Sequence, residues 1–171
     1  TWEILILLNT SVKQEVAFTN LDKVIWENPL IRKDGLLSYL SEVSSHMLPF
    51  LKERALTVIR YPNGIKGESF FQKNCPEYAP SFIRTTEKEG TDFVVCDDLS
   101  TLLWLGNQLA IEYHVPFQTI HEECPFEIVF DLDPPSRASF SLAVKAALEY
   151  VSSIESNKKI IKFAFSEINR T

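Results

Sequence analysis

Cysteine is scarce in this sequence, and the cysteines present lack the spacing of a metal or disulfide framework. The 171 residues contain three, Cys75, Cys96 and Cys124, and no C-x-x-C pair occurs. Zinc ribbons and disulfide-stapled folds need closely spaced or evenly paired cysteines. The odd, scattered set therefore favours reduced thiols, as in a cytosolic protein.

Long hydrophobic runs and nucleotide-binding loop motifs are also missing. The apolar stretch near the start, "WEILILL", is short, carries Glu3 and has no basic leader, so we expect neither a signal peptide nor a membrane span. We interpret residues 1–17 as a leader or residual linker. No G-x-S-x-G, Walker or G-x-G-x-x-G motif occurs, which argues against hydrolase, P-loop and Rossmann proteins.

The composition that remains is that of a globular domain. Apolar residues make up 45%, with twelve Phe and three Trp, enough to bury a core in one domain of this length. The net charge is −6. Because an acidic chain repels nucleic acid overall, any DNA-binding site has to be a local basic patch.

Hydrophobic periodicity predicts helices alternating with short strands. The pattern at 17–29 predicts a short structured entry that ends at Pro29. Helices are expected at 34–48, stopped by Pro49; at 102–113, capped by Asp98 or Ser100; and after Ser136, with a buried face of Phe140, Val144, Ala147, Leu148 and Val151. Strands are expected at 55–62, 68–74 (after an Asn63-Gly64 turn), 92–98, 117–121, 127–131 and 157–165. The order predicts an α+β or mixed α/β sheet with helices packed on it.

Two aspartates, Asp131 and Asp133, follow an apolar run in "EIVFDLDPPS". Residues i and i+2 of a strand point to one side, so both carboxylates would project together with Leu132 facing the core. Such a pair can hold a hard divalent cation. The alternative, which the spacing alone favours, is that both are solvated turn residues before Pro134 and Ser136.

The segment "RYPNGIKGESFFQKN" (60–74) places aromatic residues among cations. Phe70 and Phe71 cannot both face the core of a strand, so one of them should point outward. With Arg60, Lys66 and Lys73 nearby, an exposed ring would suit base stacking and phosphate contacts. A hairpin packed on both faces is the alternative.

Three further polar residues are candidates for a site. Lys23 and Lys33 lie in the N-terminal region, and Lys33 stands where a helix begins, which suits a phosphate site built on a helix N-terminus. The alternative is that both are solvated surface lysines. His114 in "YHVP" either lines a site or satisfies a helix end.

Taken in order, these pieces resemble one family. "TNLDKVIWE" (19–27), "RKDGLLSYL" (32–40), "LPFLKERALTVIRYPNGIKGESFFQKNCPEYAP" (48–80), "LSTLLWLGNQLAIEYHVP" (99–116) and "IVFDLDPPS" (128–136) are similar to the polymerase module of bacterial DNA ligase D. That module belongs to the archaeo-eukaryotic primase superfamily, and the similarity is greatest to Bacillus-type versions. The resemblance implies a primase-like mixed sheet with packed helices, and a repair polymerase of non-homologous end joining.

The resemblance also implies roles for individual residues. Asp131 and Asp133 would be the catalytic aspartates that bind Mn²⁺ or Mg²⁺. Lys23 and Lys33 would bind the 5′-phosphate of DNA, although Ile31-Arg32 replaces the usual lead-in to the second lysine. Phe70, Phe71 and Lys73 would contact DNA by stacking and through its backbone, with Arg60 and His114 as candidate lining residues. The implied partners are DNA ends or gapped DNA and nucleoside triphosphates, with Ku and a DNA ligase module as further candidates, in the bacterial cytoplasm at the nucleoid and away from membranes.

The C-terminal part departs from the family pattern. A Ser-Gly-x-x-Gly-x-His stretch, the family's later strand bearing a third carboxylate and the K-x-D-G motif of a ligase are not recognised in the sequence. We therefore expect residues 18–151 to be the N-terminal part of the polymerase-type domain, incomplete relative to the family, and residues 152–171 to be a divergent tail. Metal-dependent nucleotidyl transfer at DNA ends is the expected function; the alternatives are a non-catalytic DNA-end binding fragment and an inactive gene remnant.

Overall fold

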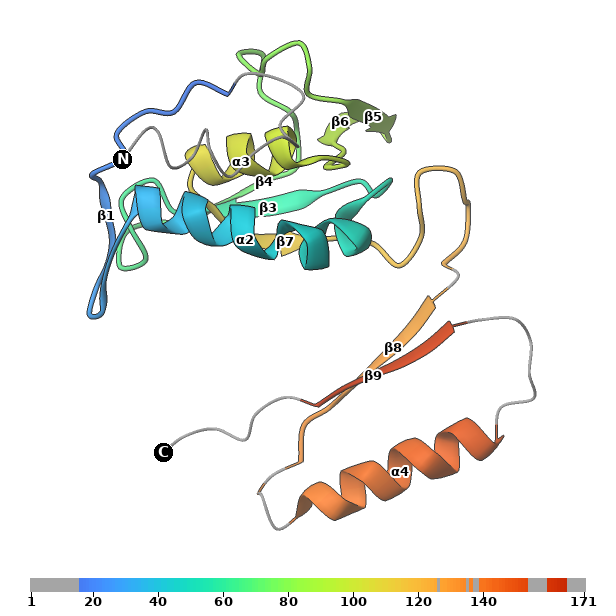
Figure 1. Ribbon diagram of the computed structural model, residues 1–171. Helices are drawn as coiled ribbons and strands as arrows, with labels where there is room; N and C mark the ends of the chain where they lie inside the picture. Colours follow the sequence, from blue (N-terminus) through green and yellow to red (C-terminus); the bar gives the residue numbers. More distant parts are fainter. Residues whose placement is uncertain (1–15, 126, 135, 137–138, 154–159, 166–171) are drawn as a thin grey trace. The chain divides into compact units, whose positions relative to one another are not determined.

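The computed structural model describes residues 16–125, 127–134, 136, 139–153 and 160–165 and forms two compact units, residues 1–121 and 122–171 (Figure 1). The strands of the first unit are β1 (Val24–Glu27), β2 (Leu30–Arg32), β3 (Thr57–Arg60), β4 (Phe70–Gln72), β5 (Thr85–Lys88), β6 (Thr91–Val94) and β7 (Ala110–His114), and its helices are α2 (Lys33–Leu51) and α3 (Leu99–Asn107). The second unit holds β8 (Glu127–Leu132), α4 (Phe140–Ser153) and β9 (Ile160–Phe165). None of the helices in these ranges is long and apolar enough to cross a membrane.

A three-stranded antiparallel sheet of order β4-β3-β7 is the frame of the first unit. Its β3–β4 connection contains the expected turn, in which Gly64 has a φ of 81° that a residue with a Cβ rarely adopts. Two separate antiparallel pairs, β1-β2 and β5-β6, complete the unit.

The core of the first unit lies where α2, α3 and the sheet meet. Leu37 of α2, Leu102 and Leu103 of α3 and Val58 of β3 are buried in one apolar cluster. The two helices approach closely at Gly106, because a Cβ built there would lie 2.4 Å from Leu40 Cδ1. The α3 helix is therefore held tightly from several sides, and Figure 1 shows it beside α2.

The C-terminal ends of both helices in the first unit differ from the sequence prediction. The α2 helix runs past Pro49 to Leu51, because a proline near the last turn removes only one backbone donor there. The α3 helix begins as expected at Asp98, whose Oδ1 accepts a hydrogen bond from the Thr101 N–H at 2.8 Å. It does not continue to residue 113: the chain turns at Leu109, where φ is 60°, and residues 110–114 form β7.

Several strand predictions are confirmed and others are wrong. Strands lie within 55–62 and 68–74, as predicted, and β6, β8 and β9 overlap the strands predicted at 92–98, 127–131 and 157–165. Residues 117–121 form no strand, and the hairpin partner β5 was not anticipated. At the N-terminal side, Pro29 lies in the turn that joins β1 to β2 and does not end the segment.

The second unit is a parallel β8-β9 pair with α4. The Phe130 ring of β8 meets the Tyr150 ring of α4 edge-on, with centroids 4.3 Å apart. Of the apolar face expected on α4, Ala147 is buried and Val144 is half-buried, but Phe140, Leu148 and Val151 are exposed. Two strands are too narrow to cover a whole helix face within this unit, so that part of the prediction is wrong.

Candidate functional site

Lys33, the first residue of α2, is buried, with 3% of its surface exposed. Its Nζ donates a hydrogen bond to the Thr19 carbonyl oxygen at 2.7 Å, and its backbone N–H donates to the Lys23 carbonyl oxygen at 2.9 Å. Segment 19–23 is therefore wrapped around the start of the helix. The alternative that Lys33 is a solvated surface lysine is wrong.

The electrostatics of this position favour an anion. Burial, followed by the positive charges of Lys23 and Arg60, lowers the pKa of Lys33 from 10.5 to about 8. Each of these effects makes the charged ammonium less favourable. We call the group of Lys23, Lys33 and Arg60 the cation site. An anion bound there would favour the charged form of Lys33 and so oppose the lowering of its pKa.

The helix N-terminus itself contributes less than the sequence suggested. The N–H of Lys33 is taken by Lys23, the N–H of Asp34 donates to the Leu21 carbonyl oxygen at 3.0 Å, and the N–H of Gly35 donates to Asp34 Oδ1 at 2.8 Å. These first-turn donors are the ones that bind phosphate at other helix starts. Binding of a phosphate at the cation site would therefore depend mainly on the charges of the side chains.

Arg60, at the end of β3, is held by a ring of acceptors. Its Nε donates to the Gln108 carbonyl oxygen at 2.8 Å and one Nη to Gln108 Oε1 at 3.1 Å, while the other Nη donates to Gln72 Oε1 at 2.7 Å and to the Tyr78 hydroxyl at 3.0 Å. The guanidinium carbon also lies 5.2 Å from the centroid of the Phe70 ring, in cation–π geometry. The orientation of this charge is thus fixed before any ligand arrives.

The paired phenylalanines point to opposite faces of the sheet. Register pairs Phe70 with Arg60 and Phe71 with Ile59, and Thr57, two residues before Ile59, pairs with His114. Phe71 therefore shares a face with His114, and their ring centroids are 6.2 Å apart. We expected one outward ring, but both are exposed, Phe70 by 45% and Phe71 by 67%, because β4 is a short edge strand.

A polar cavity of about 510 Å³ lies on the Phe71 side of the sheet. Its lining residues are Ala55, Thr57, Lys73, Lys88, Glu89, Thr91, Phe93, His114, Val115 and Pro116. His114 ends strand β7, with Nε2 at 3.2 Å from Glu112 Oε2, so the interpretation as a residue satisfying a helix end is wrong. Lys73 and His114 are thus brought together beside an exposed aromatic ring.

The two aspartates lie in the second unit. Asp131 is in β8 and Asp133 follows the strand directly; both are exposed, and Leu132 between them is half-buried. The exposed, half-buried, exposed pattern of residues 131–133 is the one expected if both carboxylates project to one side. Paired carboxylate oxygens are the donor type that Mg²⁺ and Mn²⁺ prefer, although the described residues contain no group of three or more His, Cys, Asp or Glu that could hold a metal ion.

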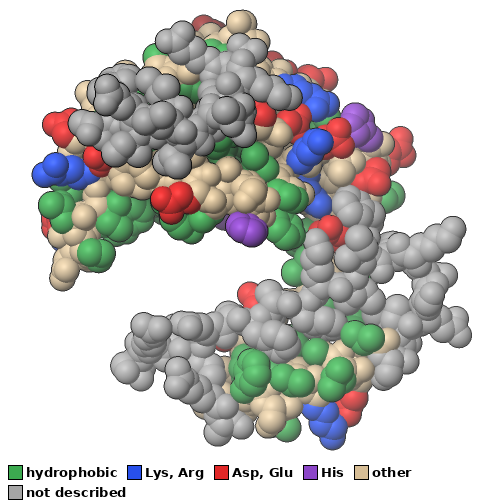
Figure 2. Space-filling model, viewed as in Figure 1, with side chains coloured by type: hydrophobic (Ala, Val, Ile, Leu, Met, Phe, Trp, Pro, Cys, Tyr) green, Lys and Arg blue, Asp and Glu red, His purple; other side chains and the backbone are tan. Residues whose placement is uncertain are grey.

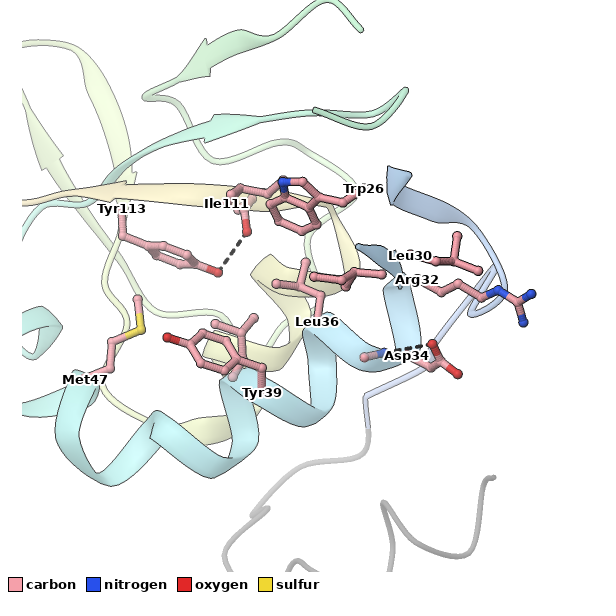
Figure 3. Close-up of a pocket in the computed structure, with 13 residues that line it drawn as sticks. Trp26, Leu30, Arg32, Asp34, Leu36, Tyr39, Met47, Ile111 and Tyr113 are labelled. Atoms are coloured by element: carbon pink, nitrogen blue, oxygen red, sulfur yellow. Dashed lines mark hydrogen bonds between the residues drawn. The ribbon is translucent and has the colours of Figure 1, made fainter. Parts of the chain in front are cut away.

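A second cavity, of about 980 Å³, was not anticipated from the sequence (Figure 3). Its lining is largely apolar and comes from the β1-β2 pair, α2 and β7: Trp26, Leu30, Ile31, Arg32, Asp34, Gly35, Leu36, Tyr39, Leu40, Met47, Ala110, Ile111 and Tyr113. Figure 3 shows the Tyr113 ring projecting from β7 into this space, with its hydroxyl bonded to the Ala110 carbonyl oxygen at 3.2 Å. None of the predicted site residues lines it.

The charges of the first unit are mixed over its surface. On the face seen in Figure 2, acidic and basic side chains are interspersed and form no broad basic area. The exposed Lys66, for example, is paired with Glu27, and Arg84 with Asp97. The face seen in Figure 2 therefore offers no broad basic area that could attract DNA by itself.

Comparisons with known proteins agree with these features. The family model of the LigD primase-polymerase domain matches residues 32–160. The chain is 56% identical over 138 residues to the bifunctional non-homologous end joining protein LigD of Bacillus subtilis, covering 81% of this chain and 23% of that protein. It is 33% identical over 128 residues to the multifunctional LigD of Mycolicibacterium smegmatis, covering 71% of this chain and 17% of that protein.

A solved structure is similar in fold. It is the polymerase domain of Mycobacterium tuberculosis ligase D in complex with DNA, with a TM-score of 0.59 and 31% identity, covering 63% of this chain and 39% of that one. The chain thus spans less than half the length of these relatives. Since the family model covers most of its residues, the chain belongs to the LigD primase-polymerase domain family.

Proposed function

We propose that this chain binds DNA ends that carry a 5′-phosphate, as part of a LigD-type repair polymerase of non-homologous end joining. The observation that carries the proposal is the environment of Lys33, a buried ammonium whose pKa is lowered by burial and by the positive charges of Lys23 and Arg60. A terminal phosphate carries close to two negative charges near neutral pH and three acceptor oxygens, which suits three converging cations.

The aromatic and polar groups of the sheet extend this proposal to the DNA beside the phosphate. The exposed rings of Phe70 and Phe71 offer stacking surfaces that accept any base. Lys73 adds a cation next to the polar cavity and His114. The relative from M. tuberculosis, solved in complex with DNA, supports nucleic acid as the ligand class.

Nucleotidyl transfer is the chemistry we propose for the complete domain. Asp131 and Asp133 would hold a divalent cation, Mn²⁺ or Mg²⁺, between their carboxylate oxygens. When bound, such a cation lowers the pKa of an attacking hydroxyl and neutralises phosphate charge. These two residues would supply negatively charged oxygen ligands at the end of a strand. Nucleoside triphosphates would be the second substrate.

Non-catalytic binding of DNA ends is the second candidate function. It is supported by the cation site and the aromatic rings, which all lie in the first compact unit. Ku and a DNA ligase module remain proposed partners, and the bacterial cytoplasm, at the nucleoid, remains the proposed location, as the family resemblance implies.

Fluorescence anisotropy with two matched gapped duplexes, one with a 5′-phosphate and one with a 5′-hydroxyl, tests the proposal. A charge-assisted contact contributes about 1.5–3 kcal/mol, so the phosphorylated duplex should bind about tenfold or more tightly at about 1.4 kcal/mol per factor of ten. Lys23→Ala and Lys33→Ala should each remove this preference. Lys52→Ala, which removes an exposed lysine just after α2, is the charge-matched control and should retain it. Equal binding of both duplexes by the unaltered chain would contradict the proposal.

A further inference from the structure

The last residue of α3, Asn107, is buried and ties the N-terminal segment to the helix. Its Oδ1 accepts a hydrogen bond from the Thr19 N–H at 3.1 Å, and its Nδ2 donates to the Ala17 carbonyl oxygen at 3.0 Å. The same Thr19 offers its carbonyl oxygen to Lys33 Nζ at 2.7 Å. The acceptor that fixes the Lys33 ammonium is therefore itself fixed by Asn107.

The next residue, Gln108, performs the same task for the second cation. Its backbone carbonyl and its Oε1 both accept hydrogen bonds from Arg60, at 2.8 and 3.1 Å. The Oε1 also lies 3.3 Å from the Tyr78 hydroxyl, which in turn accepts a hydrogen bond from Arg60 at 3.0 Å. Asn107 and Gln108 are adjacent in the sequence. Asn107 thus supports Lys33 through Thr19, and Gln108 supports Arg60 directly.

The end of α3 is well suited to hold both groups. Every residue of the helix, Leu99–Asn107, is buried, and Gly106 is in close contact with Leu40 of α2. The left-handed backbone of Leu109 ends the helix directly afterwards, which leaves the Gln108 carbonyl oxygen available to Arg60. A residue on this helix can move little without disturbing the core.

We propose that Asn107 and Gln108 are positioning residues of the cation site, Asn107 acting on Lys33 through Thr19 and Gln108 acting on Arg60. The proposal rests on the proposed function of that site. Preorganised donors bind an anion better because their ordering is complete before the ligand arrives. Neither residue needs to touch the phosphate.

Matched variants separate side-chain positioning from general destabilisation. Gln108→Ala removes the side-chain acceptor for Arg60, whereas Gln108→Asn retains a neutral amide oxygen on a side chain one methylene shorter. We expect Gln108→Ala to reduce the ratio of 5′-phosphate to 5′-hydroxyl affinity by about threefold to tenfold, corresponding to the loss of one contact at about 1.4 kcal/mol per factor of ten. Gln108→Asn should retain more of the ratio than Gln108→Ala, and Gln118→Ala, at a glutamine in the loop after β7, should leave it unchanged.

Asn107 is tested in the same duplex assay and by a measurement that needs no DNA. NMR titration of ¹³C-labelled lysine follows the ionisation of Lys33 in the full chain. Asn107→Ala should release the Thr19 segment, abolish the 5′-phosphate preference and move the titration midpoint of Lys33 upward from about 8, because a loosened segment admits water. Near-ultraviolet circular dichroism at the temperature of the assay verifies that each variant is folded.

The outcomes distinguish the two proposals. If the unaltered chain prefers the 5′-phosphate and Asn107→Ala and Gln108→Ala retain that preference, the positioning roles are wrong and the proposed function stands. If the unaltered chain shows no preference, the proposed function fails. In that case an unchanged Lys33 midpoint in Asn107→Ala overturns the Asn107 role as well, while a shifted midpoint supports it as a positioning residue of the lysine.

Discussion

Replacing Lys33 by methionine should make the stability of the first unit less dependent on pH. In the folded chain the ammonium is buried beside two other cations, and the pKa of Lys33 is lowered from 10.5 to about 8. Between these two values the unfolded chain binds a proton that the folded chain has released. Stability therefore rises with pH across this window, and the cost of the charged lysine is fully present below about pH 8.

The size of the effect follows from the pKa change. A fall from 10.5 to about 8 corresponds to about 3.4 kcal/mol at about 1.36 kcal/mol per pH unit. Solvent screens the half-buried neighbours Lys23 and Arg60, so the measured value should be nearer half of this, about 1–2 kcal/mol. Methionine fills a similar volume without charge, and it gives up the hydrogen bond to the Thr19 carbonyl oxygen.

Urea denaturation followed by tryptophan fluorescence at a series of pH values from 7 to 10 measures the effect. The buried Trp104 of α3 reports on the core of the first unit. The stability of the unaltered chain minus that of Lys33→Met should rise by about 1–2 kcal/mol between pH 7 and 10. Lys52→Met, at an exposed lysine, is the control and should show no such trend. A difference that stays flat with pH, or that falls as pH rises, would refute a depressed pKa at Lys33.

Three further outcomes are expected. Phe71→Ala should weaken binding of the 5′-phosphate and 5′-hydroxyl duplexes alike, by about 1–3 kcal/mol for one lost stacking contact, measured by anisotropy; loss confined to one duplex would contradict a stacking role. Raising the salt concentration should weaken binding of the phosphorylated duplex, and Lys23→Ala should reduce the slope of log K against log salt by about 1; an unchanged slope would place Lys23 away from phosphate. Isothermal titration with Mn²⁺ should detect weak binding that is lost in the double variant Asp131→Ala, Asp133→Ala; equal heats from both proteins would remove the assignment.

Local hydrophobic patterns predicted the helices and strands whose type the local sequence determines. They missed those whose type depends on pairing with distant segments. The spacing of Leu102, Leu105, Leu109 and Tyr113 fits one helix face, yet the chain leaves the helix at Leu109 and continues as β7. A short buried strand and a helix segment look alike in hydrophobic periodicity, and only pairing with β3 decides between them. The strand at 127–131 was easier because its apolar run ends in a turn.

The candidate site, like the fold, could be predicted only in part from the sequence. The positions of Lys23, Lys33, Phe70 and Phe71 followed from family resemblance and local pattern. The support for Arg60 could not be predicted, because its acceptor Gln108 lies 48 residues away in the sequence and is placed there by the fold alone.

The roles of Asn107 and Gln108 also carried no recognisable signal, since both lie in the middle of a stretch that reads as helix. Side chains that hold a functional group in place are visible only once the contacts between distant segments are known.

An acidic chain that binds DNA must concentrate its attraction at one place, and the environment of Lys33 provides a physical means. Burying a lysine beside Lys23 and Arg60 costs stability in the free chain, as its lowered pKa indicates. An incoming phosphate dianion relieves that cost in addition to forming new contacts, so the same groups gain more from a doubly charged end than from a backbone phosphate. The surrounding mixture of acidic and basic side chains offers no comparable gain elsewhere on the described face (Figure 2). Selectivity for a phosphorylated end over a continuous duplex can therefore arise from the electrostatic repulsion among three positive charges. It requires that the residues at the end of α3 hold these charges in place.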